Sequence, residues 1–201
     1  MDATKEPDAA GRGYHHGDLR RALIEAALEA VGDDGAANVR LRDVARRAGV
    51  SHAAPAHHFG DKAGLLTAIA VDGFELLAAA LTDAYGRTAS LLEVGVAYVR
   101  FAVDHRAHFD VMFRPELYRA DAPVLAGPKA AAAAALYGPL GAVIQDDGSP
   151  DQLTPFVAAW SLVHGLATLL LTENLPVPLG HDPEQITRRV AGYIFPASTT
   201  R

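Results

Sequence analysis

The stretch LRDVARRAGVSHAAPAHHFGDKAGLL, residues 41–66, constrains the fold of this chain more than any other. Two short segments with helical spacing lie on either side of a Gly-Val-Ser turn. Helices of about eight residues are marginal alone in water, so two in succession need a packed partner. Residues 19–30 offer one, because apolar side chains recur there at helical spacing. We therefore expect a small helical bundle at this end of the chain.

The order helix, tight turn, helix is typical of the helix-turn-helix, whose second helix enters the major groove of DNA. Gly49 permits the left-handed backbone of a tight turn, and Val50 is placed between the two helices. The first helix exposes arginines that suit phosphate oxygens, namely Arg42, Arg46 and Arg47. We expect Ser51 to cap the second helix and Pro55, at about its fourth position, to cost it a hydrogen bond. The second helix offers the groove small and histidine side chains: His52, Ala53, Ala54, Ala56, His57 and His58.

The charge distribution favours a local interface over a protein that coats nucleic acid. The formal net charge is −6, but residues 40–62 hold five Lys or Arg against two Asp. That segment is therefore +3, which leaves −9 for the remainder. A small basic island on an acidic body suits a limited stretch of DNA. The residue types alone leave a plainer alternative open, because Asp43 and Arg47 are spaced to form an ordinary helical ion pair.

Helical spacing continues through the rest of the chain, and no long stretch alternates like a strand. Asp61 is placed to cap a long helix, and capping boxes at residues 90–93, 149–152 and 182–185 open three more. We expect an all-α protein with about nine helices and no sheet. A flexible tail is expected over residues 1–13, a three-helix helix-turn-helix domain over 14–62, and a second helical domain over 63–201.

Composition narrows the class of protein further. The chain has no cysteine, which excludes disulfides and thiolate zinc sites. Residues 1–13 carry charges and no apolar run, unlike a signal peptide. Residues 156–171 form the longest apolar run, but polar residues interrupt it and it falls short of the ~20 residues of a membrane span. We expect this run to be a buried helix in a cytoplasmic protein with no membrane partner and no cofactor.

Three segments in order, GDLRRALIEAALEAVGDDG, LRDVARRAGVS and HHFGDKAGLL, resemble the N-terminal DNA-binding domain of TetR-type transcriptional regulators, over about residues 14–66. YHHGDLR, SHAAP and WSLVHG (residues 160–165) resemble the branch with a Trp-His-Gly C-terminal domain. The resemblance implies a homodimer that binds a palindromic double-stranded DNA operator, usually as a repressor, and responds to a small-molecule effector. Lys62 matches the family's lysine near the DNA backbone. Ala56 stands where the family usually has an aromatic residue that touches the backbone. Arg40 stands where the family commonly has a Ser or Thr that caps the helix beginning at Leu41, and it could itself meet a phosphate.

The implied C-terminal domain would bind the effector and form the dimer, and its residues permit both. Bulky side chains suit a pocket for a hydrophobic or aromatic effector; they are Phe101, Phe109, Met112, Phe113, Phe156, Trp160 and His164. For any single one of them, a place in the ordinary core is the more common role. The last two helices carry more apolar residues than one helix pair can bury, which suits a four-helix bundle with a second copy. The expected interface residues are Leu170, Ile186, Val190, Tyr193 and Ile194.

Two other functions compete with a regulator. His105 and His108 form an H-x-x-H pair, as in a His-based metal-dependent enzyme, but a metal site needs more convergent ligands. The sequence has no nucleophile elbow, phosphate loop or dinucleotide fingerprint. Ala56 leaves open a dimeric helical scaffold that does not bind DNA. We favour a regulator that is not an enzyme.

Overall fold

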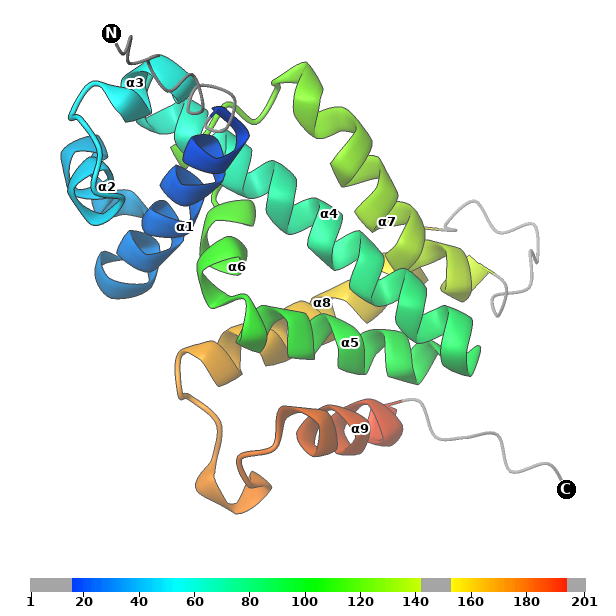
Figure 1. Ribbon diagram of the computed structural model, residues 1–201. Coiled ribbons are helices and arrows are strands. Elements are labelled where there is room, and N and C mark those ends of the chain that lie inside the picture. Colours follow the sequence, from blue (N-terminus) through cyan, green and yellow to red (C-terminus); the bar gives the residue numbers. More distant parts are fainter. Residues whose placement is uncertain (1–15, 142–152, 195–201) are drawn as a thin grey trace, which may run out of the picture.

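The computed structural model describes residues 16–141 and 153–194 (Figure 1). Within these ranges the chain forms nine α-helices, four short 3-10 helices and no strand, which confirms the predicted fold class. The first elements are α1 (His16–Asp34), η1 (Ala36–Asn38), α2 (Leu41–Arg47), α3 (Ala54–Phe59) and α4 (Lys62–Thr88). The others are α5 (Leu91–Asp104), α6 (Arg106–Met112), η2 (Pro115–Leu117), η3 (Pro123–Leu125), α7 (Ala126–Gly141), α8 (Thr154–Leu171), η4 (Val177–Leu179) and α9 (Pro183–Ile194). Helices α1 to α3 form a head, and α4 runs from it into a body made of α5 to α9 (Figure 1).

The head packs around apolar residues of α1. Leu23 of α1, Val44 of α2 and Leu66 of α4 are fully buried in one cluster. Because α2 and α3 are so short, this packing, and not their own stability, holds them in place. Gly49 has a φ of 67°, the left-handed conformation predicted for the turn, and Val50 packs against the core.

Helix α3 begins later than predicted. Its N-cap is Ala53, which makes no side-chain capping bond. Ser51 lies in the preceding turn, where its carbonyl oxygen accepts a hydrogen bond from the amide of Ala54 at 3.0 Å. The expectation that Ser51 caps α3 is therefore wrong. Pro55 lies in the first turn of the helix, where its missing N–H has no helical partner, so it costs no hydrogen bond.

Helix α4 joins the head to the body. As predicted, Asp61 caps it, accepting a hydrogen bond from the amide of Gly64 at 2.8 Å. In the middle of α4, the helix packs very closely on α6: a Cβ on Gly73 would lie 2.5 Å from the Met112 sulfur and 3.2 Å from the His108 Cβ. A shift of α6 must therefore move α4 as well, since close-packed interiors transmit displacement.

The N-cap residues of two of the three predicted capping boxes are confirmed, but the described residues show no return bond that would complete either box, and the Ser90 amide donates to the Thr88 hydroxyl instead. Ser90 accepts a hydrogen bond from the amide of Glu93 at 3.4 Å at the start of α5. Asp182 accepts one from the amide of Glu184 at 2.9 Å at the start of α9. The third box, at residues 149–152, lies outside the described residues. Arg40, the N-cap of α2, makes no side-chain capping bond, as its departure from Ser or Thr predicted.

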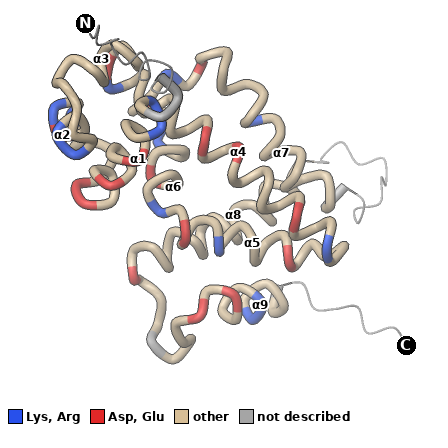
Figure 2. The backbone as a smooth tube through the Cα atoms, viewed as in Figure 1, with Lys and Arg blue, Asp and Glu red and all other residues tan. Residues whose placement is uncertain are grey.

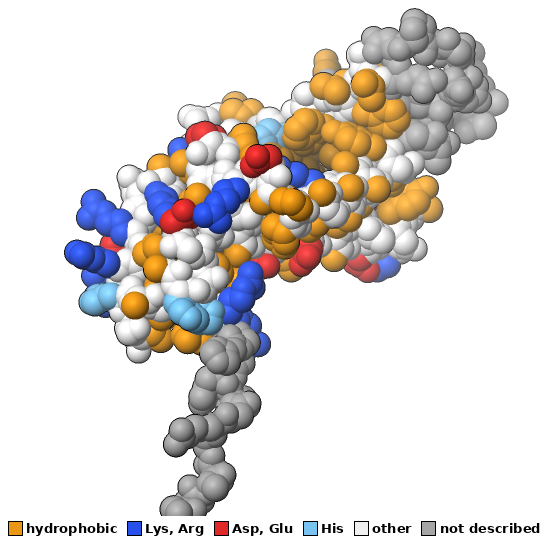
Figure 3. Space-filling view, turned by 90° about the horizontal axis from the view of Figure 1, so that it is seen from above, with side chains coloured by type: hydrophobic (Ala, Val, Ile, Leu, Met, Phe, Trp, Pro, Cys, Tyr) orange, Lys and Arg blue, Asp and Glu red, His pale blue; other side chains and the backbone are white. Residues whose placement is uncertain are grey.

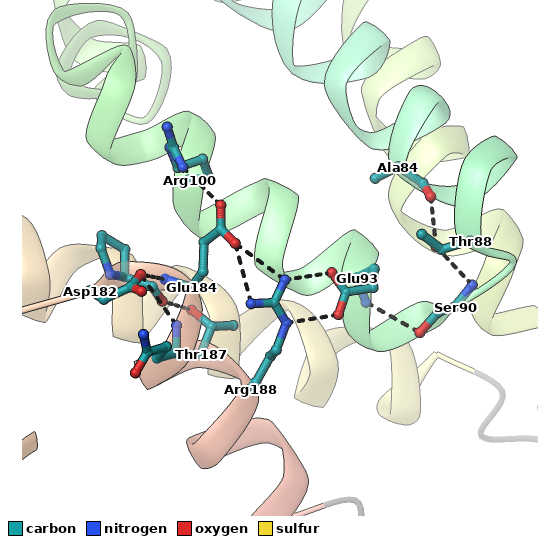
Figure 4. A network of polar contacts seen from close by, with 11 residues as sticks. Ala84, Thr88, Ser90, Glu93, Arg100, Asp182, Glu184, Thr187 and Arg188 are labelled. Atoms are coloured by element: carbon teal, nitrogen blue, oxygen red, sulfur yellow. Dashed lines mark hydrogen bonds and ion pairs between the residues drawn. The ribbon is translucent and has the colours of Figure 1, made fainter.

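Charged side chains fix α9 on α5 (Figure 4). Arg188 of α9 donates to both carboxylate oxygens of Glu93 at 2.9 and 2.8 Å, and to Glu184 at 3.2 Å. Arg100 of α5 adds a bond to Glu184 at 2.8 Å. The bidentate bond from Arg188 lowers the pKa of Glu93 below its usual value. Ile186, on the same helix, is 1% exposed, so it belongs to the core of its own protomer.

Helix α8 is more exposed than predicted. Its buried residues are Val163, Leu166 and Ala167. The opposite side of the helix carries Val157, Ala158, Ser161, Gly165 and Leu169, each exposed or half-buried. We call these five residues the α8 outer face. The expectation of a buried helix is therefore wrong for a single chain. Helices α4 and α8 are both long and apolar enough to cross a membrane, a test that core helices of soluble proteins also pass.

Candidate nucleic-acid interface and cavity

The outer surface of the head carries the residues predicted to contact DNA. Those exposed are Arg40, Arg42, Arg46, Ser51, His52, Ala53, Ala56 and His57. Those half-buried are Ala54, His58 and Lys62. Basic and histidine side chains gather at this end of the molecule (Figure 3). Because alanine side chains protrude little, the exposed side of α3 can approach the floor of a major groove.

The arginines of α2 differ in how readily each could meet a phosphate. Arg42 is exposed and forms no ion pair with the described residues. Arg46 pairs with Asp43 at 2.7 Å on the surface, where such a pair contributes little and can be exchanged for a phosphate. Arg47 instead binds Asp33 at the acidic end of α1 at 2.8 Å (Figure 2). Arg47 therefore holds α2 to α1, and the alternative of an Asp43–Arg47 pair is wrong.

Two neighbouring side chains tie the start of α4 to other elements. Lys62 donates to the carbonyl oxygen of Ala37 in η1 at 2.6 Å, and partial burial lowers its pKa. Asp61 accepts a hydrogen bond from the guanidinium of Arg119 in the body at 2.9 Å. Lys62 would have to give up the Ala37 carbonyl before it could bind a phosphate.

A cavity of about 330 Å³ lies in the body among α4, α5, α6, α7 and α8. We call it the α4–α8 cavity. Its lining is mostly apolar and comprises Phe74, Leu77, Tyr98, Met112, Phe113, Pro115, Tyr118, Lys129, Ala132, Ala133, Leu136, Tyr137 and Trp160. From the predicted ligand-binding set it includes Met112, Phe113 and Trp160. Its size and lining suit a small, mostly apolar molecule.

Hydrogen bonds join α5 to α8 at the wall of this cavity. Trp160 donates from its indole nitrogen to the hydroxyl oxygen of Tyr98 at 3.1 Å, and that oxygen lies 3.0 Å from Nδ1 of His164. Burial raises the pKa of Tyr98 and lowers the pKa of His164, so both side chains are neutral near pH 7. The phenol can then donate to the imidazole. The His164 ring also lies 5.2 Å from that of Phe109 and 4.6 Å from that of Phe113, so His164 is a half-buried side chain held by a hydrogen bond and two aromatic rings.

The structure does not bring the other predicted ligand-binding residues to the α4–α8 cavity. Phe109 and His164 line a second cavity of about 460 Å³ between the end of α1, α6 and α8. Phe101 lines a groove between α4, α5 and α9. Phe156 lines another between α5, α7 and α8. Apolar side chains on every face of these helices look alike in sequence, so the pattern could not separate the four surfaces.

Sequence reasoning missed Lys129 and Tyr118 as residues of the α4–α8 cavity. The Lys129 ammonium lies 5.4 Å from the ring centre of Tyr118 and 5.7 Å from that of Phe74. Lys129 precedes a run of alanines, where a lysine usually marks a solvated helix face. Its position in the sequence therefore gave no sign that it lines a pocket.

The two histidines of the H-x-x-H pair do not build a metal site. Their ring centres lie 5.7 Å apart. Among the described residues, no group of three or more His, Asp or Glu could hold a metal ion. Burial, and then the neighbouring His105, lowers the pKa of His108 to about 4. His108 is a buried neutral side chain between α6 and α4.

The head and the body each match a known family of sequences. Residues 23–69 match the family described as "Bacterial regulatory proteins, tetR family". Residues 91–192, about half of the chain, match "Tetracyclin repressor-like, C-terminal domain". The chain belongs to the TetR family. Members are transcriptional regulators and not enzymes, so the predicted resemblance is confirmed and the enzyme alternative is wrong. The Trp-His-Gly branch stays a prediction.

Two solved relatives share the fold of this TetR-family regulator, and a third is similar to part of it in sequence. The chain is 51% identical over 47 residues to the HTH-type transcriptional regulator BetI of Agrobacterium fabrum, a match that spans 23% of each chain. A solved protein of unknown function from Rhodococcus sp. RHA1 is 32% identical with a TM-score of 0.67, over 91% of this chain and 97% of that one. LfrR from Mycobacterium smegmatis, solved in complex with proflavine, is 18% identical with a TM-score of 0.64, over 91% and 98%. At 18% identity the likeness shows the fold alone.

Proposed function

We propose that this TetR-family regulator is a homodimer that binds a roughly palindromic operator through α3 of each copy. A small hydrophobic or aromatic effector fills the α4–α8 cavity and lowers the affinity for DNA. We infer repression as the mode of control and the cytoplasm, where the operator lies, as the location. The placement of an exposed, small-residue α3 beside the arginines of α2, at one end of the molecule, carries this proposal (Figure 3).

The exposed side of the head supports DNA binding in two ways. Arg42 is unpaired among the described residues, and Arg46 holds only an exchangeable surface pair. Both suit phosphate oxygens, which position a protein on DNA without reading its sequence. The ring of His57, exposed on α3, can donate to or accept from a base edge.

The α8 outer face supports the dimer. Val157 and Leu169 are 52% and 43% exposed, and a Cβ built on Gly165 would have no described atom within 4 Å. Small residues between larger apolar ones let two helices cross closely. A two-fold pairing of α8 and α9 would bury this face against its own copy and present two α3 helices to one side of the DNA.

The residues expected at the interface divide in the structure. Tyr193 is 88% exposed on α9 and is free to join an interface with a second copy. Leu170 and Val190 are half-buried and pack against the core of the protomer. Ile186 is buried, and the side chain of Ile194 lies outside the described part of the chain. We therefore place the centre of the proposed interface on α8, with Tyr193 at its edge.

The effector role rests on the position of the cavity beside the elements that hold the head. Helix α4 passes from Lys62 at the head along the cavity wall. Helix α6 contacts the head directly, since Asp110 accepts a hydrogen bond from the amide of Ala36 at 2.9 Å. An effector that displaces either helix would alter the head, with a coupling free energy typically ~1–3 kcal/mol.

Selection of bound DNA from a random library tests the proposal. We expect a palindrome with half-sites about one helical turn, or a multiple, apart. Affinity should fall with salt at a log–log slope of about −0.9 per phosphate contact. Arg42→Ala removes one contact from each copy of the dimer and should reduce that slope by about two, whereas the matched control Arg87→Ala, at the far end of α4, should leave it unchanged. The absence of a palindrome, together with a slope near zero, would favour the dimeric scaffold without DNA binding.

A further inference from the structure

The described lining of the α4–α8 cavity contains one charged side chain, Lys129 of α7. Its ammonium faces the rings of Tyr118 and Phe74 and donates to the carbonyl oxygen of Ala120 at 3.2 Å. It forms no ion pair with a described carboxylate. An ammonium group has three donors, and its strongest partner is an anionic oxygen. Lys129 is half-buried, so the donors that the two rings and the carbonyl leave over face water, and the acid group of a ligand can take them.

We propose that this cavity binds an apolar or aromatic monoanion whose acid group pairs with Lys129. The inference deepens the effector role proposed above and rests on it. The remaining lining is aromatic and aliphatic and suits the body of such a ligand. A neutral ligand would displace water from the ammonium without replacing it by a counter-charge, and a cationic ligand would be repelled. The acid group therefore decides which ligands are accepted.

The segment next to this lysine reaches the head. Tyr118 lies in the cavity wall, and its hydroxyl donates to the carbonyl oxygen of Met112 at 3.0 Å. The next residue, Arg119, contacts α4 twice. Its amide donates to the Thr67 hydroxyl at 3.1 Å, and its guanidinium donates to Asp61 at 2.9 Å. Residues 118–120 thus connect the cavity to the residue that caps α4.

An acid bound to Lys129 competes for the ammonium with its two partners in this segment, the ring of Tyr118 and the carbonyl of Ala120. Loss of both contacts leaves residues 118–120 held by the Tyr118–Met112 and Arg119–Thr67 bonds alone, which loosens the segment and weakens the Arg119–Asp61 ion pair. Because Asp61 lies between α3 and α4, this loosening changes how α3 is held. The charge of the ligand thereby affects the position of α3, which binds DNA.

Isothermal titration calorimetry tests the ligand class without DNA. The probes are naphthalene-2-carboxylate, its neutral carboxamide and the cationic naphthalen-2-ylmethylamine, with octanoate and octanamide as an aliphatic pair. We expect at least one acid to bind about tenfold tighter than its amide, and the amine to bind most weakly. Lys129→Met should abolish the preference for the acid and keep the affinity for the amide, which also shows that the variant folds. Lys129→Arg should retain the preference.

Three results would overturn the assignment: acids that bind no tighter than their amides, no binding of any probe, or a preference that persists in Lys129→Met. The matched control is Arg106→Met, which changes a cation of the second cavity. Loss of the acid preference in that variant alone would place the ligand there and also refute the proposal. Since calorimetry needs no operator, failure of DNA binding and failure of the ligand class are separate results.

The route to the head is tested with the acid that binds and with the selected DNA. In the wild type, saturating acid should lower DNA affinity about fivefold or more. Arg119→Gln and Asp61→Asn should bind the acid normally and reduce this ratio toward one. Asparagine still caps a helix, so Asp61→Asn removes the charge and keeps the cap. Arg87→Gln, which breaks an exposed pair with Asp83, should keep the wild-type ratio. Two results would refute the route: an acid that lowers DNA affinity as much in Arg119→Gln as in the wild type, or an acid that does not change DNA affinity in the wild type.

Discussion

Replacement of Val157 by glutamate should split the proposed dimer. Val157 is 52% exposed on the α8 outer face, so an interface there would bury the other half of its surface. Burial of a whole valine is worth roughly 1.5–3 kcal/mol, so the half still exposed contributes about 1 kcal/mol per copy. A glutamate forfeits that gain and adds the cost of removing a carboxylate from water, which is several kcal/mol when unpaired. The two-fold axis places both copies of the change in one interface.

The summed effect of two copies is at least about 4 kcal/mol, or a thousandfold rise in the dimer dissociation constant. Sedimentation velocity over a range of concentrations measures this directly. Val124→Glu is the matched control, because Val124 is 59% exposed on η3. The control should remain dimeric. DNA affinity should fall with the dimer in Val157→Glu and remain unchanged in Val124→Glu.

An uncharged variant separates blocked approach from repulsion. Gly165→Leu should fold, since no described atom lies within 4 Å of the added Cβ and leucine favours helix over glycine. It should nevertheless weaken the dimer, because an extra side chain at a close helix crossing overpacks the contact by about 1–3 kcal/mol per copy. Gly86→Leu, at an equally open position of α4, should have no effect on the dimer. If Val157→Glu and Gly165→Leu both stay dimeric and bind DNA normally, the interface lies elsewhere.

Two further predictions concern single residues. Ala56→Tyr should strengthen DNA binding with little change in the preferred sequence, because it restores the aromatic residue that contacts the DNA backbone in the family. His57→Ala should weaken DNA binding. Gel shifts with the selected site measure both affinities. His108 has a folded-state pKa of about 4, below the ~6.5 of an unfolded histidine, so the unfolded chain takes up the proton first. Stability should therefore be full above about pH 6.5 and fall toward pH 4, by roughly 2 kcal/mol at pH 5. Urea unfolding at fixed protein concentration measures the free energy of unfolding at each pH. His108→Gln should lose the part of the pH dependence that His108 causes. The same pH dependence in both proteins would contradict the lowered pKa of His108.

The parts of this fold that sequence reasoning predicted depend on residues close together in the chain. Asp61 caps α4 through an amide three positions away, and Ser90 caps α5 in the same way. Gly49 adopts the left-handed conformation that the turn between α2 and α3 requires. Such roles can be read from spacing, because the partner is fixed once the helix forms. The failure at Ser51 has the same local origin: the turn extends through Ala53, so Ser51 lies too early to reach the helix.

The parts of the fold that sequence reasoning missed depend on which faces of distant helices pack against each other. Arg47 was placed on the exposed side of α2, yet its partner Asp33 lies fourteen positions away on α1. Phe101 and Phe113 look equivalent in sequence but line different surfaces. Hydrophobic spacing shows that one side of a helix is buried. It does not show which of several neighbours buries it, and a pocket is defined by those neighbours.

Asp61 shows how the two kinds of information combine at one residue. Its role as a cap was predicted, and a cap needs only one acceptor oxygen, the one that binds the amide of Gly64. The second carboxylate oxygen is left over and accepts from Arg119, 58 positions away. A serine or threonine cap would offer a single oxygen and no charge, so it could cap α4 but could not also form an ion pair with Arg119 of the body. The choice of aspartate at this cap is what allows a local helix start to respond to a distant cavity.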